Sequence, residues 1–379
     1  MLSREIVLPL PLNSVATGVV CGRTLPKKVL LKLLIYKHIF MNKHLPNSLR
    51  ALFLSLAVLL SLPMLAEKVE IDGINYDLDA KAKQATVIAK SSGKYSGKVV
   101  IPESVKFKGV THSVTSIGQS AFSGCSVLTS VTIGNSVTWI GEDAFYGCSG
   151  LTSVHIPNSV TSIGYRAFCD CSGLTSVHIS DIAAWCNIDF LSTDSNPLYY
   201  AHHLYLNGEE VKDLVIPNSV TSIGKRAFQY CYGLTSVTIP NSVTSIRYEA
   251  FRRCYGLTLV TIPNSVTSIG IRAFRDCSEL LDVYCYAEKV PSTQSNAFDG
   301  SYPEYATLHV PAASIDSYKA TEPWYYFGKI VALTPDETGI DELKGENGKV
   351  KTALYDLSGR RVQKVQKGIF IQNGKVMVR

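Results

Sequence analysis

The sequence predicts a mainly β repeat solenoid, and two observations support this prediction. A 23-residue unit recurs six times in the chain, starting at Ser113, Ser136, Ser159, Ser219, Ser242 and Ser265. Each unit also contains two short runs in which apolar and small polar residues alternate, which is typical of half-buried strands. Because one unit cannot bury its apolar residues alone, we expect the units to stack around one continuous core.

The repeat that starts at Ser219 illustrates each expected element. The run "SVTSIG" is a brief strand closed by Gly224, and "RAFQYC" returns an Ala, a Phe and a Cys to the core as a helical or 3-10 turn. The run "LTSVTI" is the longer strand, with its Leu, Val and Ile pointing inward. Pro240 and Asn241 then turn the chain, because Pro fixes φ and Asn tolerates unusual backbone angles.

An insertion separates the third repeat from the fourth. The starting serines follow one another at a constant spacing within each block, whereas the step from Ser159 to Ser219 contains an additional segment. We interpret this segment, residues 182–218, as one enlarged, irregular repeat with a hairpin at Asn207-Gly208, since that dipeptide suits a type I′ turn. We expect this repeat to interrupt the stack and to project from one face.

The pattern LxxVxIPxSVxxIGxxAFxxCxx resembles the BspA-like group of leucine-rich-repeat proteins, and the match runs from about Tyr95 to Ala332. The copies depart from it at local turns, namely at Arg247 in place of Gly, at Gly134 in place of Pro, and at Ser180-Asp181 in place of Pro-Asn. The resemblance implies a leucine-rich-repeat array. It also implies adhesion to matrix proteins such as fibronectin or fibrinogen, or to neighbouring bacteria.

The N-terminal residues predict export. Residues 41–66 have a charged start, an apolar core and Ala66 at the end of a cleavage site, which is typical of a signal peptide. The alternative is a membrane anchor, because the apolar run approaches spanning length. Residues 1–40 are interpreted as a non-native upstream extension, with Met41 as the true start.

The C-terminal residues 349–379 offer three short strands and follow a linker, residues 336–348. The runs Tyr355-Asp356-Leu357, Gly359-Arg360 and Lys367 to Phe370, with the basic tail, resemble the sorting domain of the type IX secretion system. That resemblance implies recognition by secretion machinery and a place outside the outer membrane of a Gram-negative bacterium, secreted or on the cell surface. The alternative is a small β cap.

The remaining residues divide into caps and repeats. We predict an N-terminal β cap at 67–112, repeats 1–3 at 113–181, repeats 4–6 at 219–288 and a C-terminal cap at 289–335. Because a solenoid needs its ends covered, we expect Trp324, Tyr325 and Phe327 to pack over the last coil.

Six of the ten cysteines share one repeat position, namely Cys125, Cys148, Cys171, Cys231, Cys254 and Cys277. Stacked coils hold equivalent side chains parallel at about 4.7–4.9 Å, whereas a disulfide needs converging Cβ atoms about 3.5–4.5 Å apart. We therefore expect a buried ladder of small apolar thiols. A bridge among Cys169, Cys186 and Cys285 is left open.

Composition and motifs argue against nucleic-acid binding and against catalysis. Residues 1–66 hold eight of the 37 basic residues and one of the 31 acidic ones, so the rest of the chain is nearly neutral. Catalytic and nucleotide-binding motifs are absent from the sequence. Only the insertion gathers side chains that an enzyme would use, namely Asp189, Asp194, His202 and His203. We predict no enzyme, no cofactor and no metal site.

Two surfaces are candidates for ligand binding. Arg and Tyr are typical of interface hot spots and suit an acidic partner, and around the Ala-Phe motif of repeats 4–6 the candidates are Arg226, Tyr230, Tyr248, Arg252, Arg253, Arg272 and Arg275. The alternative is the outward face of the "LTSVTI" strands, with Thr132, His155, His178, Thr238 and Thr261. Either surface is equally compatible with ordinary solvation.

These observations predict an exported, cell-surface binding protein that performs no chemistry. Its ligand would be a protein or a glycan on host matrix or on other cells, with no stable membrane span in the mature chain. The alternatives are a surface glycan-binding protein for nutrient capture and a structural surface-layer component.

Overall fold

The structure is a computed structural model that describes residues 67–334 and the backbone of short strands at 19–20, 23–24, 354–355, 369–372 and 375–378. The chain divides into two compact units, residues 1–66 and 67–379. In the first, β1 (Val19–Val20) pairs with β2 (Arg23–Thr24). The predicted signal peptide lies outside the described residues.

The N-terminal cap is a twisted sheet that continues into the repeats. Strands β3 (Glu67–Ile71), β4 (Ile74–Asp79) and β5 (Gln84–Ile88) are antiparallel, and β7 (Ser104–Phe107) is antiparallel to β8 (Val110–Ile117). Parallel pairing of β5 with β8 joins the cap to the first coil. The cap therefore supplies the ladder that the first repeat extends.

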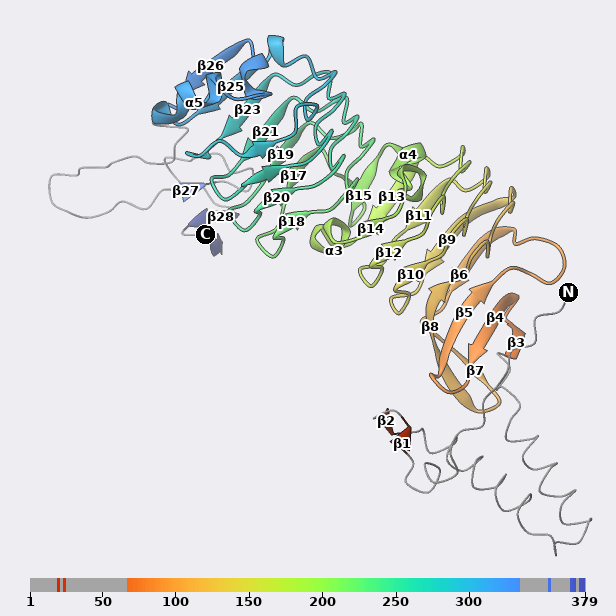
Figure 1. Cartoon of the computed structure of the whole chain (residues 1–379). Helices are drawn as coiled ribbons and strands as arrows, with labels where there is room; N and C mark the ends of the chain where they lie inside the picture. The colour runs from red at the N-terminus through yellow and green to blue at the C-terminus, as the bar shows by residue number, and fades with distance from the viewer. Residues whose placement is uncertain are drawn as a thin grey trace, which may run out of the picture. The chain divides into compact units, whose positions relative to one another are not determined.

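Repeats 1–3 form two parallel ladders (Figure 1). The long strands are β6 (Gly97–Ile101), β9 (Leu128–Ile133), β11 (Ser153–His155), β13 (Ser176–Ile179) and β15 (Leu204–Leu206). The short strands that follow β8 are β10 (Trp139–Ile140), β12 (Ser162–Ile163) and β14 (Asp189–Phe190). Ser153 pairs with Ser176, so the register between these coils equals the 23-residue period.

Repeats 4–6 build a second pair of ladders. The long strands are β17 (Asp213–Val215), β19 (Ser236–Thr238), β21 (Leu259–Ile262), β23 (Asp282–Cys285), β25 (Thr307–Val310) and β26 (Lys329–Ala332). The short strands are β18 (Ser222–Ile223), β20 (Ser245–Ile246), β22 (Ser268–Ile269) and β24 (Ser292–Thr293). Residues 289–335 thus begin with one further coil, made by β24, the turn at Ala297-Phe298 and β25.

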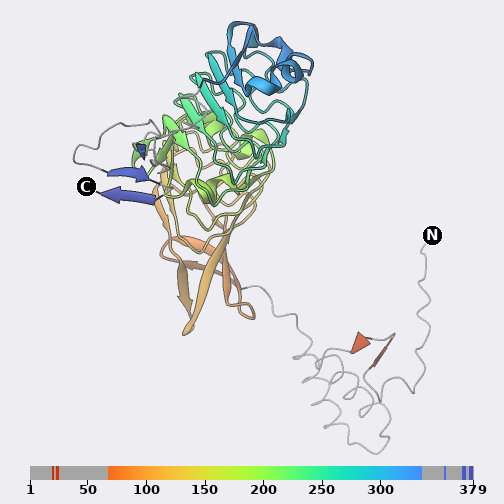
Figure 2. The same cartoon turned by 90° about the vertical axis from the view of Figure 1, so that its left-hand side faces the viewer.

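The C-terminal cap closes this second pair of ladders after β25. Between β25 and β26 lie η3 (Ala312–Ser314), α5 (Ile315–Lys319) and η4 (Trp324–Tyr326), and η2 (Pro303–Tyr305) lies just before β25. Figure 2 shows these short helices at one end of the stack and the long strands of the N-terminal cap at the other. Farther along the chain, the three strands expected in residues 349–379 are present as β27 (Leu354–Tyr355), β28 (Ile369–Gln372) and β29 (Lys375–Val378). Most of the residues on which the resemblance to a sorting domain rests lie outside the described part, and the others are described by their backbone alone.

The insertion interrupts both ladders, as predicted. It contains α3 (Ile182–Cys186), η1 (Thr193–Ser195) and α4 (Leu198–Ala201), followed by a hairpin of β15 and β16 (Glu209–Glu210). Asn207 and Gly208 both have positive φ, as a type I′ turn requires. Within residues 67–334, no strand of the first block pairs with one of the second.

Hydrogen bonds from side chains and from isolated backbone groups link the insertion to the second block in place of strand pairing, as in Gly224 N to Cys186 O at 3.0 Å. The Trp185 indole donates a hydrogen bond to the Ala227 carbonyl at 2.8 Å, and the Asn196 amide donates to the Arg226 carbonyl at 2.8 Å. Because these groups are wholly or partly buried, the block junction is satisfied without a β ladder.

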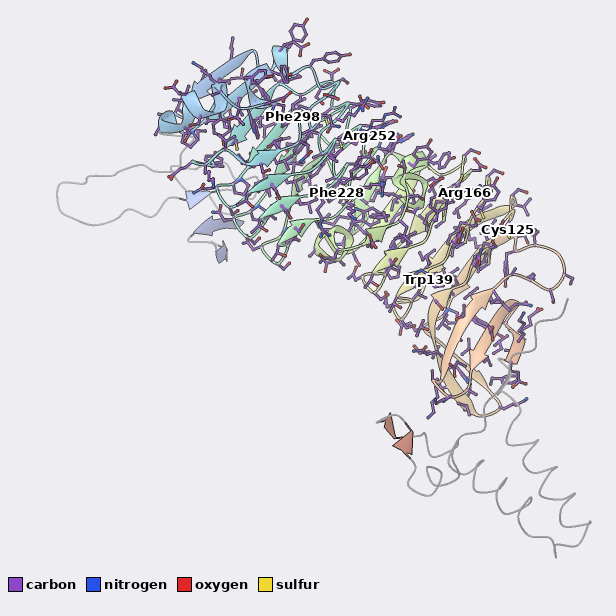
Figure 3. All side chains as sticks on the ribbon, in the orientation of Figure 1. Cys125, Trp139, Arg166, Phe228, Arg252 and Phe298 are labelled. Carbon is purple, nitrogen blue, oxygen red and sulfur yellow. The ribbon has the colours of Figure 1, made fainter. Side chains whose placement is uncertain are left out.

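A ladder of phenylalanine rings fills the core. In repeats 1–3 the rings of Phe122, Phe145 and Phe168 stack at 5.0 Å, and in the second block the rings from Phe228 to Phe298, both labelled in Figure 3, stack at 5.3–5.4 Å. The N-terminal end is covered by Tyr95, and the C-terminal end by Trp324 and Phe327. The prediction for Tyr325 was wrong, because its ring is exposed: the short η4 turn directs neighbouring side chains to opposite sides.

The expected ladder of buried thiols is confirmed, and the structure adds a hydrogen bond to it. All nine described cysteines are free, including Cys169, Cys186 and Cys285. Four thiols donate to a phenylalanine carbonyl of the preceding coil at 3.1–3.2 Å, namely those of Cys148, Cys171, Cys254 and Cys277. The cysteines therefore satisfy backbone acceptors as well as filling space.

Candidate functional site

The Ala-Phe segment of each repeat forms one edge of the stack, which we call the turn edge. Consecutive i→i+3 hydrogen bonds close it, such as Gln229 N to Arg226 O at 3.1 Å. Two residues of the segment, Arg226 and Tyr230, have positive φ, which breaks the expected helical turn into separate turns. Adjacent turns are also hydrogen-bonded, so equivalent side chains of successive repeats lie in columns.

One column contains Arg226, Glu249 and Arg272, and it centres on a buried carboxylate. The Glu249 side chain is only 2% exposed, and its oxygens lie 3.3 Å from Arg226, 3.6 Å from Arg272 and 2.9 Å from Arg252. Gln229 donates a further hydrogen bond at 3.1 Å. A carboxylate this buried needs such partners, because an isolated buried charge is very costly.

The next column is organised around Asp276. Its carboxylate lies 3.3 Å from Arg253, 3.7 Å from Arg275 and 3.9 Å from Arg252. Arg252 therefore bridges Glu249 and Asp276. All five arginines predicted as candidates for ligand binding belong to one continuous network. Figure 3 marks Arg252 on this edge, with Arg166 of the first block farther along it.

Two tyrosines, Tyr248 and Tyr230, pack against arginines of the network. The Arg226 guanidinium lies 4.9 Å from the Tyr248 ring centroid, and that of Arg253 lies 5.2 Å from the Tyr230 ring while donating to its hydroxyl at 3.0 Å. Tyr230 is only 7% exposed, and burial raises the pKa of its hydroxyl. Tyr230 thus orients Arg253, whereas the partly exposed guanidiniums meet the solvent.

The turn edge keeps an excess of positive charge after these contacts. Five guanidiniums face two carboxylates. Guanidiniums bind carboxylate, sulfate and phosphate groups in paired hydrogen bonds. The arrangement suits an anionic ligand held by Arg253, Arg272 and Arg275, the most exposed of the five.

The insertion extends this edge with aromatic rings that the sequence reasoning did not include. Tyr199 contacts Tyr230 at 4.8 Å, and the His202 ring stacks on Tyr232 at 3.9 Å. Tyr232 in turn contacts Tyr255 at 4.8 Å. The aromatic rings therefore continue across the junction between the blocks.

The residues of the alternative face lie in two different sheets. His155 pairs with Thr132 and with His178 in the first block, whereas Thr238 pairs with Thr261 in the second. The His178 ring stacks on Tyr205 at 5.0 Å. The pKa of His155 is lowered, mainly because the ring is partly buried and to a smaller extent because His178 is nearby. The residues of this face therefore lie on parallel strands of two separate sheets, and the insertion lies between the two sheets.

The insertion residues considered for an enzyme have separate partners. Asp194 accepts a hydrogen bond from Ser192 at 2.6 Å, and His203 lies 2.6 Å from Glu210. His202 stacks on Tyr232, and Asp189 lies in the short strand β14. Each of the four has its own local setting.

Neither a metal cluster nor a membrane-spanning helix is found in the part of the chain that the structure describes. Within residues 67–334, no group of three or more His, Cys, Asp or Glu side chains is arranged to hold a metal ion. Among the described helices, none has the length and apolar character needed to cross a membrane.

Comparison with protein families identifies the repeats. Residues 103–190 and 201–319, more than half of the chain, match the model of the BspA type leucine rich repeat region in six copies. No curated protein matches the chain.

Three solved structures illustrate the similarity. A leucine rich cell surface protein from Faecalibacterium prausnitzii A2-165 is 21% identical over 71% of this chain and 95% of its own, with a TM-score of 0.36. A leucine-rich repeat protein from Bacteroides ovatus is 22% identical over 71% and 77%, with a TM-score of 0.39. One from T. pallidum is 24% identical over 56% and 91%, with a TM-score of 0.37.

Proposed function

The chain belongs to the BspA type leucine-rich-repeat family, a family of non-catalytic repeats, and we propose that it is an exported, cell-surface binding protein. Its partner is an anionic surface, on a host matrix protein or on a neighbouring cell, and it binds at the turn edge of repeats 4–6. The role is adhesion. The signal-peptide pattern of residues 41–66 and the resemblance of residues 349–379 to a sorting domain support export.

The observation that carries this proposal is the arginine network. Buried Glu249 and half-buried Asp276 fix five guanidiniums in place, so the side chains lose little further freedom on binding. Their net positive charge favours an acidic patch or a sulfated chain over a neutral ligand. Tyr230 also packs against Arg253, whose guanidinium is partly exposed and can be reached by a partner.

A charge-matched pair of variants tests the proposal. Replacing Arg253, Arg272 and Arg275 by Gln removes the exposed guanidiniums while Arg226 and Arg252 still pair with Glu249. The control replaces three exposed lysines of the N-terminal cap by Gln, namely Lys68, Lys81 and Lys106. Binding of the purified protein to immobilised fibronectin, fibrinogen and heparin is measured at low and at physiological salt.

We expect the arginine variant to bind about tenfold more weakly and with a flatter salt dependence, because screened surface charges drive the association. The lysine control should bind like the parent protein. Equal losses in the two variants would contradict the proposal. Binding to cells that resists protease treatment but is lost after glycosidase treatment would favour glycan capture. Self-association without any foreign ligand would favour a surface-layer role.

A further inference from the structure

The C-terminal cap contains an open groove of about 510 Å³ that lies beyond the last arginine coil. Its lining includes Phe298, Asp299, Tyr302, Glu304, Pro323 and Tyr326. Phe298, labelled in Figure 3, is the last phenylalanine of the core ladder and is one of the residues that line the groove. One residue of the lining therefore belongs to the packed core, and the others lie in the turns and 3-10 helices of the cap.

Two exposed tyrosines line this groove, and two more are close to them in sequence. Tyr302 and Tyr326 line it, and Tyr305 and Tyr325 are close in sequence; the four are 46–81% exposed. The rings of Tyr325 and Tyr326 lie 4.5 Å apart, and the Tyr326 hydroxyl donates to Glu322 at 3.1 Å. Large aromatic side chains gathered at the surface of a folded domain are typical of a binding site.

The charge of the groove is negative. Asp299 and Glu304 line it, and no lysine, arginine or histidine is among its lining residues. Within residues 67–334, neither carboxylate forms an ion pair, whereas Asp276, one coil earlier, contacts three arginines. The backbone of Asp276 donates to the Asp299 carbonyl at 2.8 Å, so the basic network and the acidic groove are neighbours on one edge.

Carboxylates beside tyrosine faces provide the chemistry that recognises an alkyl cation. A carboxylate pairs with an ammonium or guanidinium group, and the face of a tyrosine attracts the same cation. We propose that this groove binds a lysine or arginine side chain of a polypeptide partner. The inference is independent of the anionic ligand proposed for the arginine network, because it uses different residues and the opposite charge.

The test uses the whole purified protein and labelled oligoarginine and oligolysine peptides, with a Gly-Ser peptide as the neutral probe. Asp299→Asn with Glu304→Gln removes the groove's charge, and Tyr326→Ala removes one ring. The matched controls are Glu209→Gln with Glu279→Gln, two exposed carboxylates elsewhere, and Tyr165→Ala, an exposed tyrosine of the first block. Fluorescence anisotropy measures the affinity, and circular dichroism checks folding.

We expect the double amide variant to bind the basic peptides about tenfold more weakly and Tyr326→Ala about threefold more weakly, as ion pairs and cation–π contacts at exposed sites predict. The controls should bind them unchanged, and the variant at Arg253, Arg272 and Arg275 should bind them at least as tightly, because it removes positive charge next to the groove. Groove variants that match their controls would overturn the inference. So would saturable binding of a neutral oligosaccharide, or self-association, lost in those same variants. The arginine variant failing its own test leaves this result unaffected.

Discussion

Repeats 1–3 (residues 113–181) and repeats 4–6 (residues 219–288) have equivalent interiors and contrasting turn edges. In both blocks phenylalanine rings stack at 5.0–5.3 Å, and thiols donate to the carbonyl of the coil before. At the turn edge the first block carries Ser120, Asp143 and Arg166, with a single Arg–Asp contact at 3.7 Å. The second carries Arg226, Glu249 and Arg272 within a network of seven charges.

This difference shows where the repeat is free to vary. A core position must fill the same space against both neighbouring coils, so its residue type recurs. A turn-edge side chain meets solvent and the equivalent positions of adjacent coils, so charge at this edge can be gathered without cost to packing. The five arginines in neighbouring columns would repel one another, so this edge also needs a buried acid, Glu249, between them.

The largest expected effect tests the shared interior. Burial raises the pKa of Cys148 in the first block, and of Cys231 and Cys277 in the second, from 9.0 to about 12. The folded state thus favours the neutral thiol. The neutral thiols make their full contribution to the free energy of unfolding below pH 9, and this contribution is lost as the pH rises toward about 12. Above pH 9, each thiol lowers the free energy of unfolding by about 1.4 kcal/mol per pH unit. For the three thiols together, the loss is about 4 kcal/mol at about pH 10.

Denaturant unfolding followed by tryptophan fluorescence measures this loss between neutral and alkaline pH. Because both blocks carry the ladder, we expect them to lose stability together. Replacing Cys231, Cys254 and Cys277 by Ala should lower the free energy of unfolding at neutral pH. It should also reduce the further loss of that free energy at alkaline pH. An alkaline loss that is the same in that variant and in the parent protein would contradict the account.

The second prediction tests the difference between the turn edges of the two blocks. Glu249→Gln removes a carboxylate that is 2% exposed from three arginines, and we expect a loss of about 3 kcal/mol in the free energy of unfolding. Asp143→Asn in the first block removes a partly exposed partner and should cost below about 1 kcal/mol. Denaturant midpoints of the two variants give the contrast.

Sulfate sharpens this experiment. If three unneutralised guanidiniums cause the loss, added sulfate should restore part of the stability of Glu249→Gln and have a smaller effect on Asp143→Asn. Equal destabilisation of the two variants, or rescue by chloride at matched ionic strength, would show that the carboxylate does not organise the network.

Much of the fold could be predicted because burial recurs with the sequence period. The constant repeat spacing predicted stacked units, in which His155 and His178 pair on adjacent strands, and the thiol geometry argued correctly against disulfides. The coil within residues 289–335 was not recognised, since it lacks the repeat's cysteine. Ala297 and Phe298 were its signal, together with Ser301, whose hydroxyl donates to the Phe274 carbonyl in place of the thiol.

The candidate site could be predicted only in part. The arginines of repeats 4–6 were visible in the sequence, whereas Glu249 and Asp276 were not singled out as their partners. A signal existed: Glu249 stands between two arginines at one repeat position, so stacking places opposite charges next to each other. The exposed tyrosines of the cap had no such signal, because the 3-10 turns that direct Tyr325 and Tyr326 outward follow no repeat.

The smallest expected effect concerns the backbone that both edges share. Ser120 and Glu249 occupy the same repeat position with φ of 54°, where a side chain costs about 1 kcal/mol and glycine costs almost nothing. Glycine also gives the unfolded chain more freedom, which offsets about half of that gain. Ser120→Gly should therefore stabilise the protein by about 0.5 kcal/mol. Glu249→Gly should destabilise it, because the loss of the buried carboxylate outweighs the relief of the backbone. Denaturant midpoints report both signs, and destabilisation by Ser120→Gly would mean that this column is held by side-chain contacts in the first block as well.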